Sequence, residues 1–150
     1  MKIMFVCTGN ICRSAMAEYL AKQKIKEMGK EIAVESCGTQ AYTGEEATQN
    51  TIMVLQKRGI SEAKKHHATN HQDTDIKGSD LILCATQTHK RKMQSLYPEK
   101  KDVIKTMKEY AYETQDLNIA DPWGYSLETY ENCCIEIEKC VTEIIKRLTR

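Results

Sequence analysis

The segment Ile3-Met4-Phe5-Val6 is apolar at every position, and this restricts the fold more than any other feature. A strand with two apolar faces is typical of a parallel sheet that is covered by helices on both sides. Further short strands are predicted at 32–36, 80–85 and 101–105. With 150 residues, of which 41% are hydrophobic, the chain can bury one core.

Helical segments alternate with these strands. They are predicted to run from Ser14 to Gly29 and over Thr48–Arg58, Thr86–Leu96 and Ser126–Arg150. The polar stretch 61–78 has no clear pattern, and 109–121 is predicted to be a long loop. The alternation predicts the α/β class: a single three-layer domain over residues 1–150, in which helices flank a four-stranded parallel sheet.

The loop after the first strand, Cys7-Thr8-Gly9-Asn10-Ile11-Cys12-Arg13-Ser14, has the spacing Cys-x5-Arg-Ser. In such sheets, ligands bind beyond the carboxyl ends of the strands. Backbone N–H groups that curl in front of a helix bind anions, and Gly9 permits that curl. Arg13 can hold two oxygens of a phosphate. The loop is therefore predicted to be a phosphate site.

Cys7 is the predicted nucleophile of this loop. Cysteine attacks as the thiolate, which a helix N-terminus and a guanidinium both favour. Ser14 can donate a hydrogen bond to the sulfur, and Asn10 can fix the loop through bonds to the backbone. The alternative interpretation is a glycine turn with an incidental buried cysteine. The position between a buried strand and a helix favours the catalytic interpretation.

The segment Asp121-Pro122-Trp123-Gly124 supplies the candidate general acid, Asp121. A leaving group departs more readily when it is protonated. Pro122 would fix the presentation of the carboxyl group, and Trp123 would desolvate it and line a pocket. An Asp-Pro turn with a partly buried tryptophan is the simpler alternative.

The composition narrows the classes of partner. With a formal net charge of +1, the chain has no basic field for nucleic acid, and no apolar run approaches the ~20 residues that span a bilayer. A cytoplasmic monomer without membrane insertion is expected. The seven cysteines form no Cys-x-x-Cys pairs and are expected to be free thiols. His66, His67 and His71 are predicted to be solvated, and no metal or other cofactor is expected.

The stretch Val6–Ser14, followed by Met16-Ala17-Glu18, resembles the signature of the low-molecular-weight protein tyrosine phosphatases. Asp121-Pro122 matches the general-acid loop of that family, and Ala15 stands where the family usually has proline. The resemblance covers essentially the whole chain. It implies phosphorylated protein substrates, inorganic phosphate as a product, and no metal or other cofactor.

The resemblance also implies roles for residues. Cys7, Arg13 and Asp121 would be catalytic: a phosphocysteine forms on Cys7, and water then hydrolyses it with Asp121 as the base. The phosphate-binding and substrate-binding residues would be Thr8, Gly9, Asn10, Ile11, Cys12, Ser14, Tyr42 and Trp123. Cys12 matches a position that can form a disulfide with the nucleophile, which would make the enzyme redox-sensitive. Its alternative role is that of a small buried residue under the loop.

Two branches of this family act on different substrates. One acts on phosphotyrosine; the other, in Gram-positive bacteria, acts on phosphoarginine and resembles this chain in Cys-Thr-Gly-Asn and Asp-Pro-aromatic-Gly. The arginine branch has threonine after the asparagine, whereas this chain has Ile11, an apolar wall for an aromatic ring. Tyr42, Trp123 and Tyr125 could add aromatic walls. Phosphotyrosine is favoured, and protein arginine phosphatase activity is the alternative.

Two other classes of function remain open. Thiol-coupled arsenate reductases share the Cys-x5-Arg loop, but they need two further cysteines. Here Cys84 ends the third predicted strand, and the next cysteine is Cys133. The other class is a non-enzymatic phosphopeptide-binding module. The presence of both Cys7 and Asp121 argues against it.

Overall fold

Four parallel strands form the centre of the computed structural model, which describes all 150 residues. They are β1 (Lys2–Cys7), β2 (Ala33–Gly38), β3 (Leu81–Cys84) and β4 (Ile104–Thr106), in the order β2-β1-β3-β4. β1 pairs with β2 on one side and with β3 on the other. Its residues from Ile3 to Cys7 are all buried. The predicted all-parallel sheet is confirmed.

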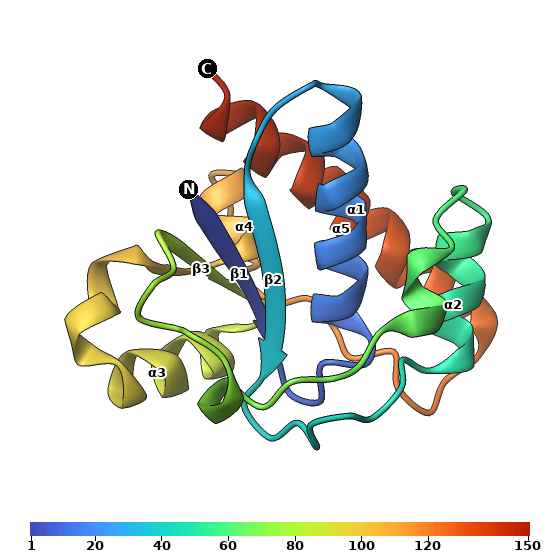
Figure 1. Ribbon diagram of the computed structural model, residues 1–150, viewed down its shortest axis with the longest axis horizontal. Helices are drawn as coiled ribbons and strands as arrows, with labels where there is room; N and C mark the ends of the chain where they lie inside the picture. The colour runs from blue at the N-terminus through green and yellow to red at the C-terminus, as the bar shows by residue number, and fades with distance from the viewer.

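Helices cover both faces of the sheet (Figure 1). They are α1 (Arg13–Glu27), α2 (Gln49–Gln56), α3 (Gln87–Leu96), α4 (Met107–Ala111) and α5 (Leu127–Leu148). Ile3 and Phe5 point into the larger apolar cluster, to which α1, α2, α4 and α5 contribute. Met4 and Val6 point into a smaller cluster with Met93 of α3. This alternation along β1 explains why every position of the strand is apolar.

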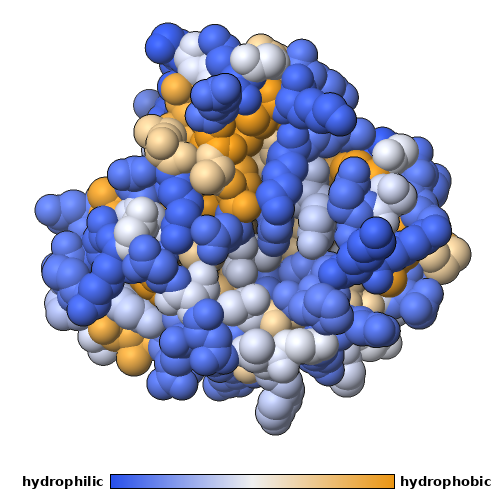
Figure 2. All heavy atoms as spheres, in the orientation of Figure 1, coloured by the Kyte–Doolittle hydropathy of each residue, from blue (hydrophilic) through white to orange (hydrophobic).

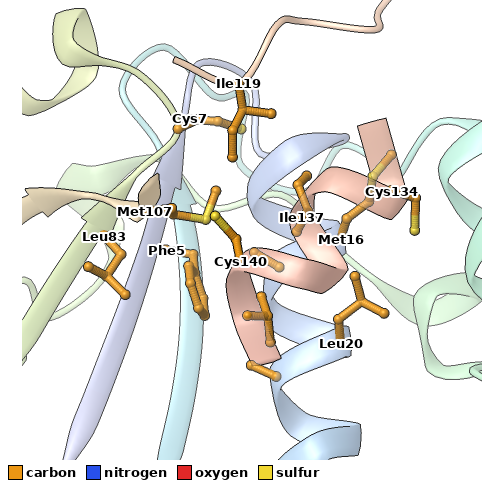
Figure 3. Packing of buried hydrophobic residues seen from close by; sticks show 14 of the residues in the cluster. Phe5, Cys7, Met16, Leu20, Leu83, Met107, Ile119, Cys134, Ile137 and Cys140 are labelled. Carbon is orange, nitrogen blue, oxygen red and sulfur yellow. The ribbon is translucent and has the colours of Figure 1, made fainter. Parts of the chain in front are cut away.

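The long helix α5 closes the larger core. Ser126 caps it, because its hydroxyl accepts the N–H of Thr129. Ile137 and Cys140 are fully buried, between α1 and the sheet residue Phe5 (Figure 3). All seven cysteines are free thiols and are buried. The cysteines of α5 therefore act as small apolar residues of the core.

One α-helix was not predicted. Residues 109–111 were expected in a loop, but they belong to α4. Thr106 caps α4 by accepting the N–H of Glu109 at 3.0 Å, and the Glu109 carboxylate accepts the N–H of Thr106 at 2.7 Å. This reciprocal capping box stabilises a helix of five residues that has little apolar periodicity of its own.

Two of the three histidines that were predicted to be solvated are buried, so that prediction was wrong for them. The ring of His66 contacts the Tyr19 hydroxyl at 2.9 Å and the Asn10 carbonyl at 2.7 Å. His71 contacts the Tyr97 hydroxyl at 2.7 Å, and burial lowers its pKa. Only His67 is exposed. Hydrogen bonds to distant residues engage both nitrogens of His66 and Nδ1 of His71, although the segment around the rings is polar.

Hydrophilic side chains cover most of the molecular face drawn in Figure 2, with some apolar residues exposed in its upper part. None of the helices combines the length and the apolarity that crossing a bilayer requires.

Candidate active site

The Cys7–Ser14 loop connects the carboxyl end of β1 to the first turn of α1. Cys7 is 2% exposed, and its sulfur lies 2.9 Å from the Ser14 hydroxyl oxygen. The Ser14 N–H also donates to this sulfur, at 3.5 Å. Two donors from the start of a helix thus surround the sulfur, an arrangement that stabilises a thiolate.

Asn10 determines the shape of the loop. Its φ of 58° lies in the left-handed region, which costs energy for a residue with a side chain. Buried hydrogen bonds hold it there: its amide donates to Ser14 and Ser36, both at 2.8 Å, and its side-chain oxygen accepts the N–H of Thr69 at 2.9 Å. The ring of His66 contacts its carbonyl. Four residues from three segments of the chain therefore fix one strained residue.

A buried carboxylate extends this network. The Ser36 hydroxyl donates to Glu18, a residue of α1 that is 8% exposed. Lys22, one turn later, pairs with the same carboxylate at 2.5 Å. Ser36 and His66 were not predicted as supports of the loop, because they lie far from it in the chain. Glu18 belongs to the signature quoted above, but its contact with Ser36 was not predicted.

The loop carries free backbone donors. The N–H groups of Gly9, Asn10, Ile11 and Cys12 donate to no other group of the protein. Because buried N–H groups are nearly always paired, a run of unpaired ones in front of a helix forms a nest for an anion. Gly38, at the end of β2, makes room for this curl: a Cβ there would lie 2.3 Å from the Thr8 carbonyl oxygen.

The Arg13 side chain lies beside the loop and is almost fully buried. One terminal nitrogen donates to the Ile119 carbonyl at 2.8 Å, and the other lies 3.7 Å from the Asp121 carboxylate. The bond to Ile119 fixes the guanidinium. Arg13 therefore places positive charge at the pocket without the freedom of an exposed side chain.

The structure brings Asp121 to the same place, but it does not desolvate the carboxylate. The Asp121 side chain is 54% exposed, and its other oxygen accepts the N–H of Trp123 at 3.1 Å. Trp123 is 63% exposed, so the expectation that its ring covers Asp121 was wrong. Trp123 lies in a tight turn, in which the N–H of Tyr125 donates to the Pro122 carbonyl at 3.0 Å and Gly124 has φ of 82°.

These groups line a pocket of about 360 Å³. The predicted residues that line it are Cys7, Thr8, Gly9, Ile11, Cys12, Arg13, Tyr42, Asp121 and Trp123. Asn10 and Ser14 are fully buried beneath it. Gln40 and Glu45 also line the pocket and were not predicted. Two larger surface hollows, of about 580 and 590 Å³, contain no cysteine, so they offer no thiol nucleophile.

Cys12 is the second thiol of the pocket. Its sulfur lies 3.3 Å from the Tyr130 hydroxyl and 3.7 Å from that of Thr48. Burial raises the pKa of Cys12, so that it stays a neutral thiol at pH 7. No three His, Cys, Asp or Glu side chains anywhere in the chain converge in a way that could hold a metal ion.

Comparison with known proteins gives a consistent answer. A family model described as low molecular weight phosphotyrosine protein phosphatase matches residues 2–150. The protein-arginine-phosphatase of Bacillus subtilis is 32% identical over 100% of this chain and 98% of its own length. The low molecular weight protein-tyrosine-phosphatase PtpB of Staphylococcus epidermidis is 33% identical over 96% of each chain.

Solved structures agree with this result. The low molecular weight protein tyrosine phosphatase of T. tengcongensis superimposes with a TM-score of 0.92 at 37% identity, covering 98% of this chain and 99% of its own. YwlE arginine phosphatase with a phosphorylated active-site serine gives a TM-score of 0.93 at 30% identity, covering 100% and 97%. The chain therefore belongs to the family of low molecular weight phosphotyrosine protein phosphatases.

Proposed function

We propose that this protein hydrolyses phosphotyrosine on proteins through a phosphocysteine on Cys7. The observation that carries the proposal is the position of the Cys7 sulfur. It lies between two donors of Ser14, at a pocket that also contains free loop N–H groups and the Arg13 guanidinium. These groups match what in-line attack on a phosphate dianion requires: a thiolate, and donors for the charged oxygens.

The reaction has two steps. The Cys7 thiolate attacks phosphorus, the bond to the tyrosyl oxygen breaks, and Asp121 gives its proton to that oxygen. Asp121 then takes a proton from water as the water attacks phosphorus. The sulfur–phosphorus bond breaks, which releases inorganic phosphate and restores the thiolate. The exposure of Asp121 and its place on the pocket wall suit a group that must meet both a leaving group and water.

The walls of the pocket favour an aromatic substrate side chain. Ile11 presents an apolar surface, and Tyr42 and Trp123 are 79% and 63% exposed on the same pocket. Exposed aromatic rings can stack on a phosphotyrosine ring, and each such contact contributes about 0.5–1.5 kcal/mol beyond the buried area.

Phosphoarginine is the second candidate substrate. Two of the similar proteins are named protein-arginine-phosphatases, from Bacillus subtilis and Geobacillus stearothermophilus. In this chain the carboxylates of Glu45 and Asp121 line the pocket, and Glu45 forms no ion pair within the protein. These carboxylates would attract the guanidinium group of phosphoarginine, whereas the uncharged ring of phosphotyrosine would gain nothing from them.

The substrate is tested with one peptide sequence that carries either phosphotyrosine or phosphoarginine. We expect a higher kcat/KM on phosphotyrosine, and we expect Ile11→Thr to move the ratio toward phosphoarginine. Ile11→Val, which keeps the wall apolar, is the matched control. A higher kcat/KM of the unmodified protein on phosphoarginine would replace the first candidate by the second.

The covalent step is tested separately. In Asp121→Asn, the second step loses its base, so phosphate bound to the protein should accumulate when the substrate has a good leaving group such as p-nitrophenol. Mass spectrometry of the acid-quenched protein should place this phosphate on Cys7. Cys7→Ala is the control and should carry none. Phosphate on any other residue would contradict the proposed mechanism.

A further inference from the structure

His89 lies directly behind the phosphate loop and has no part in the reaction as described above. It belongs to α3 and is 7% exposed. Its Nε2 lies 2.7 Å from the Thr8 hydroxyl oxygen, and its Nδ1 lies 2.8 Å from the hydroxyl oxygen of Thr86. Thr8 follows Cys7 in the chain and lines the active-site pocket. One buried ring therefore connects the start of α3 to the loop.

The ring is neutral at physiological pH. Burial lowers the pKa of His89 to about 4, and the nearby Arg13 guanidinium acts in the same direction. A neutral imidazole has one N–H donor and one acceptor nitrogen. The two threonine hydroxyls must therefore play opposite roles: one accepts from the ring, and the other donates to it.

The capping of α3 indicates which role each hydroxyl takes. Thr86 is the N-cap, and its oxygen already accepts the backbone N–H of His89 at 3.2 Å. The only other partner of this hydroxyl is Nδ1 of the ring, so the Thr86 hydroxyl donates its hydrogen to Nδ1. Nε2 then carries the proton and donates it to Thr8. The hydrogen of the Thr8 hydroxyl cannot point back at His89 and is left for the pocket.

We propose that His89 is a positioning residue that fixes the Thr8 hydroxyl so that it donates a hydrogen bond to the substrate bound in the pocket. This inference rests on the proposed phosphatase function, since it assigns the substrate an additional donor. Its physical basis is the removal of rotational freedom: a hydroxyl whose oxygen is already occupied from behind presents its hydrogen in one direction.

The tautomer is measured first, without any substrate. Nitrogen-15 NMR of the imidazole rings at pH 7 should show His89 protonated on Nε2 and unprotonated on Nδ1. Protonation on Nδ1 would overturn the inference, because Thr8 would then have to donate to the ring. This result does not depend on activity, so it separates a failure of the inference from a failure of the proposed function.

The role in the reaction is measured by a double-mutant cycle. The loss of one neutral hydrogen bond to the substrate should lower kcat/KM by about 2- to 12-fold. Thr8→Val and His89→Leu should each lower kcat/KM by about that factor, and the double variant should be no worse than either single one. Losses that multiply in the double variant would overturn the coupling.

Two conservative variants separate positioning from a general structural role. His89→Gln can place an amide N–H near the position of Nε2, and Thr8→Ser keeps the hydroxyl; both should retain most of the kcat/KM. They also carry the test if His89→Leu does not fold. A loss in His89→Gln as large as that in Thr8→Val, in a protein with unchanged circular dichroism, would count against the inference.

Discussion

The hydroxyl oxygen of Ser14 lies 2.9 Å from the Cys7 sulfur while it accepts an N–H of Asn10 at 2.8 Å. Because Asn10 occupies a lone pair of the oxygen, the Ser14 hydrogen has two acceptors within reach, and the Cys7 sulfur at 2.9 Å is nearer than the Cys37 carbonyl oxygen at 3.4 Å. A hydrogen bond to a charged group contributes about 1.5–3 kcal/mol. The Ser14 hydroxyl can make this bond when the Cys7 thiolate attacks and again when the thiolate leaves phosphorus.

Ser14→Ala should therefore lower kcat by about 10- to 150-fold, the equivalent of that bond. Steady-state kinetics on an aryl phosphate measures the loss. Ser79→Ala is the matched control, because Ser79 is also fully buried but lies outside the pocket. A kcat that is unchanged in Ser14→Ala would mean that the thiolate is stabilised by other groups.

Asn10 should be more sensitive to alanine than to glycine. Both changes remove the three side-chain hydrogen bonds, but only glycine adopts a φ of 58° at no steric cost. We expect Asn10→Ala to lower the free energy of unfolding by about 1 kcal/mol more than Asn10→Gly does. Urea denaturation measures both. Equal destabilisation would mean that the strain at Asn10 is unimportant.

Most of the fold and the nucleophile could be predicted because their signals are local. A run of consecutive apolar residues defines β1, and the Cys-x5-Arg loop follows it directly, so one stretch of sequence contains strand, nest and nucleophile. Gly29, with φ of 65°, ends α1 as its position predicted. Each of these features depends on neighbours within a few residues, which the sequence displays.

The supports of the site could not be predicted because their partners are far away in the chain. His66 contacts the Asn10 carbonyl across 56 residues, and His89 contacts Thr8 across 81. Both lie in polar segments, where composition predicts solvation. The exposure of Trp123 was missed for a different reason: the direction of one side chain in a loop is not encoded in any periodicity of the sequence.

Cys12 should protect Cys7 from irreversible oxidation. Hydrogen peroxide converts the Cys7 thiolate to a sulfenic acid; attack by the Cys12 thiol would then form a disulfide and release water. Cys7 and Cys12 line the same pocket. Inactivation by peroxide should be fully reversed by dithiothreitol in the unmodified protein and only partly in Cys12→Ser. The control is Cys133→Ser, which removes a buried thiol outside the pocket; equal recovery in Cys12→Ser would refute the protective role.

His89 should make the fold sensitive to mild acid. Its pKa is lowered to about 4 in the folded protein, chiefly by burial and then by Arg13 and Lys92, while Asp121 opposes the shift. In the unfolded chain the ordinary value is about 6.5, so below that pH the unfolded state binds a proton that the folded state does not. His89 therefore costs no stability above pH 6.5, and the cost grows as the pH falls toward 4. Its full size is on the order of 3 kcal/mol.

The pH dependence of unfolding isolates this contribution. Urea denaturation at pH 7.5 and 4.5 should show a smaller loss of stability in His89→Gln than in the unmodified protein, because glutamine does not titrate. His67→Asn is the control, since it removes an exposed imidazole and should leave the pH dependence as it was. The pKa of His71 is also lowered, so His71 also reduces the stability of the folded protein as the pH falls. This effect is the same in every variant and cancels when the variants are compared. If His89→Gln lost as much stability as the unmodified protein, then His89 would be able to bind a proton in the folded state. The pKa of His89 would then be similar in the folded and unfolded states, and burial could not be the cause of a lowered value.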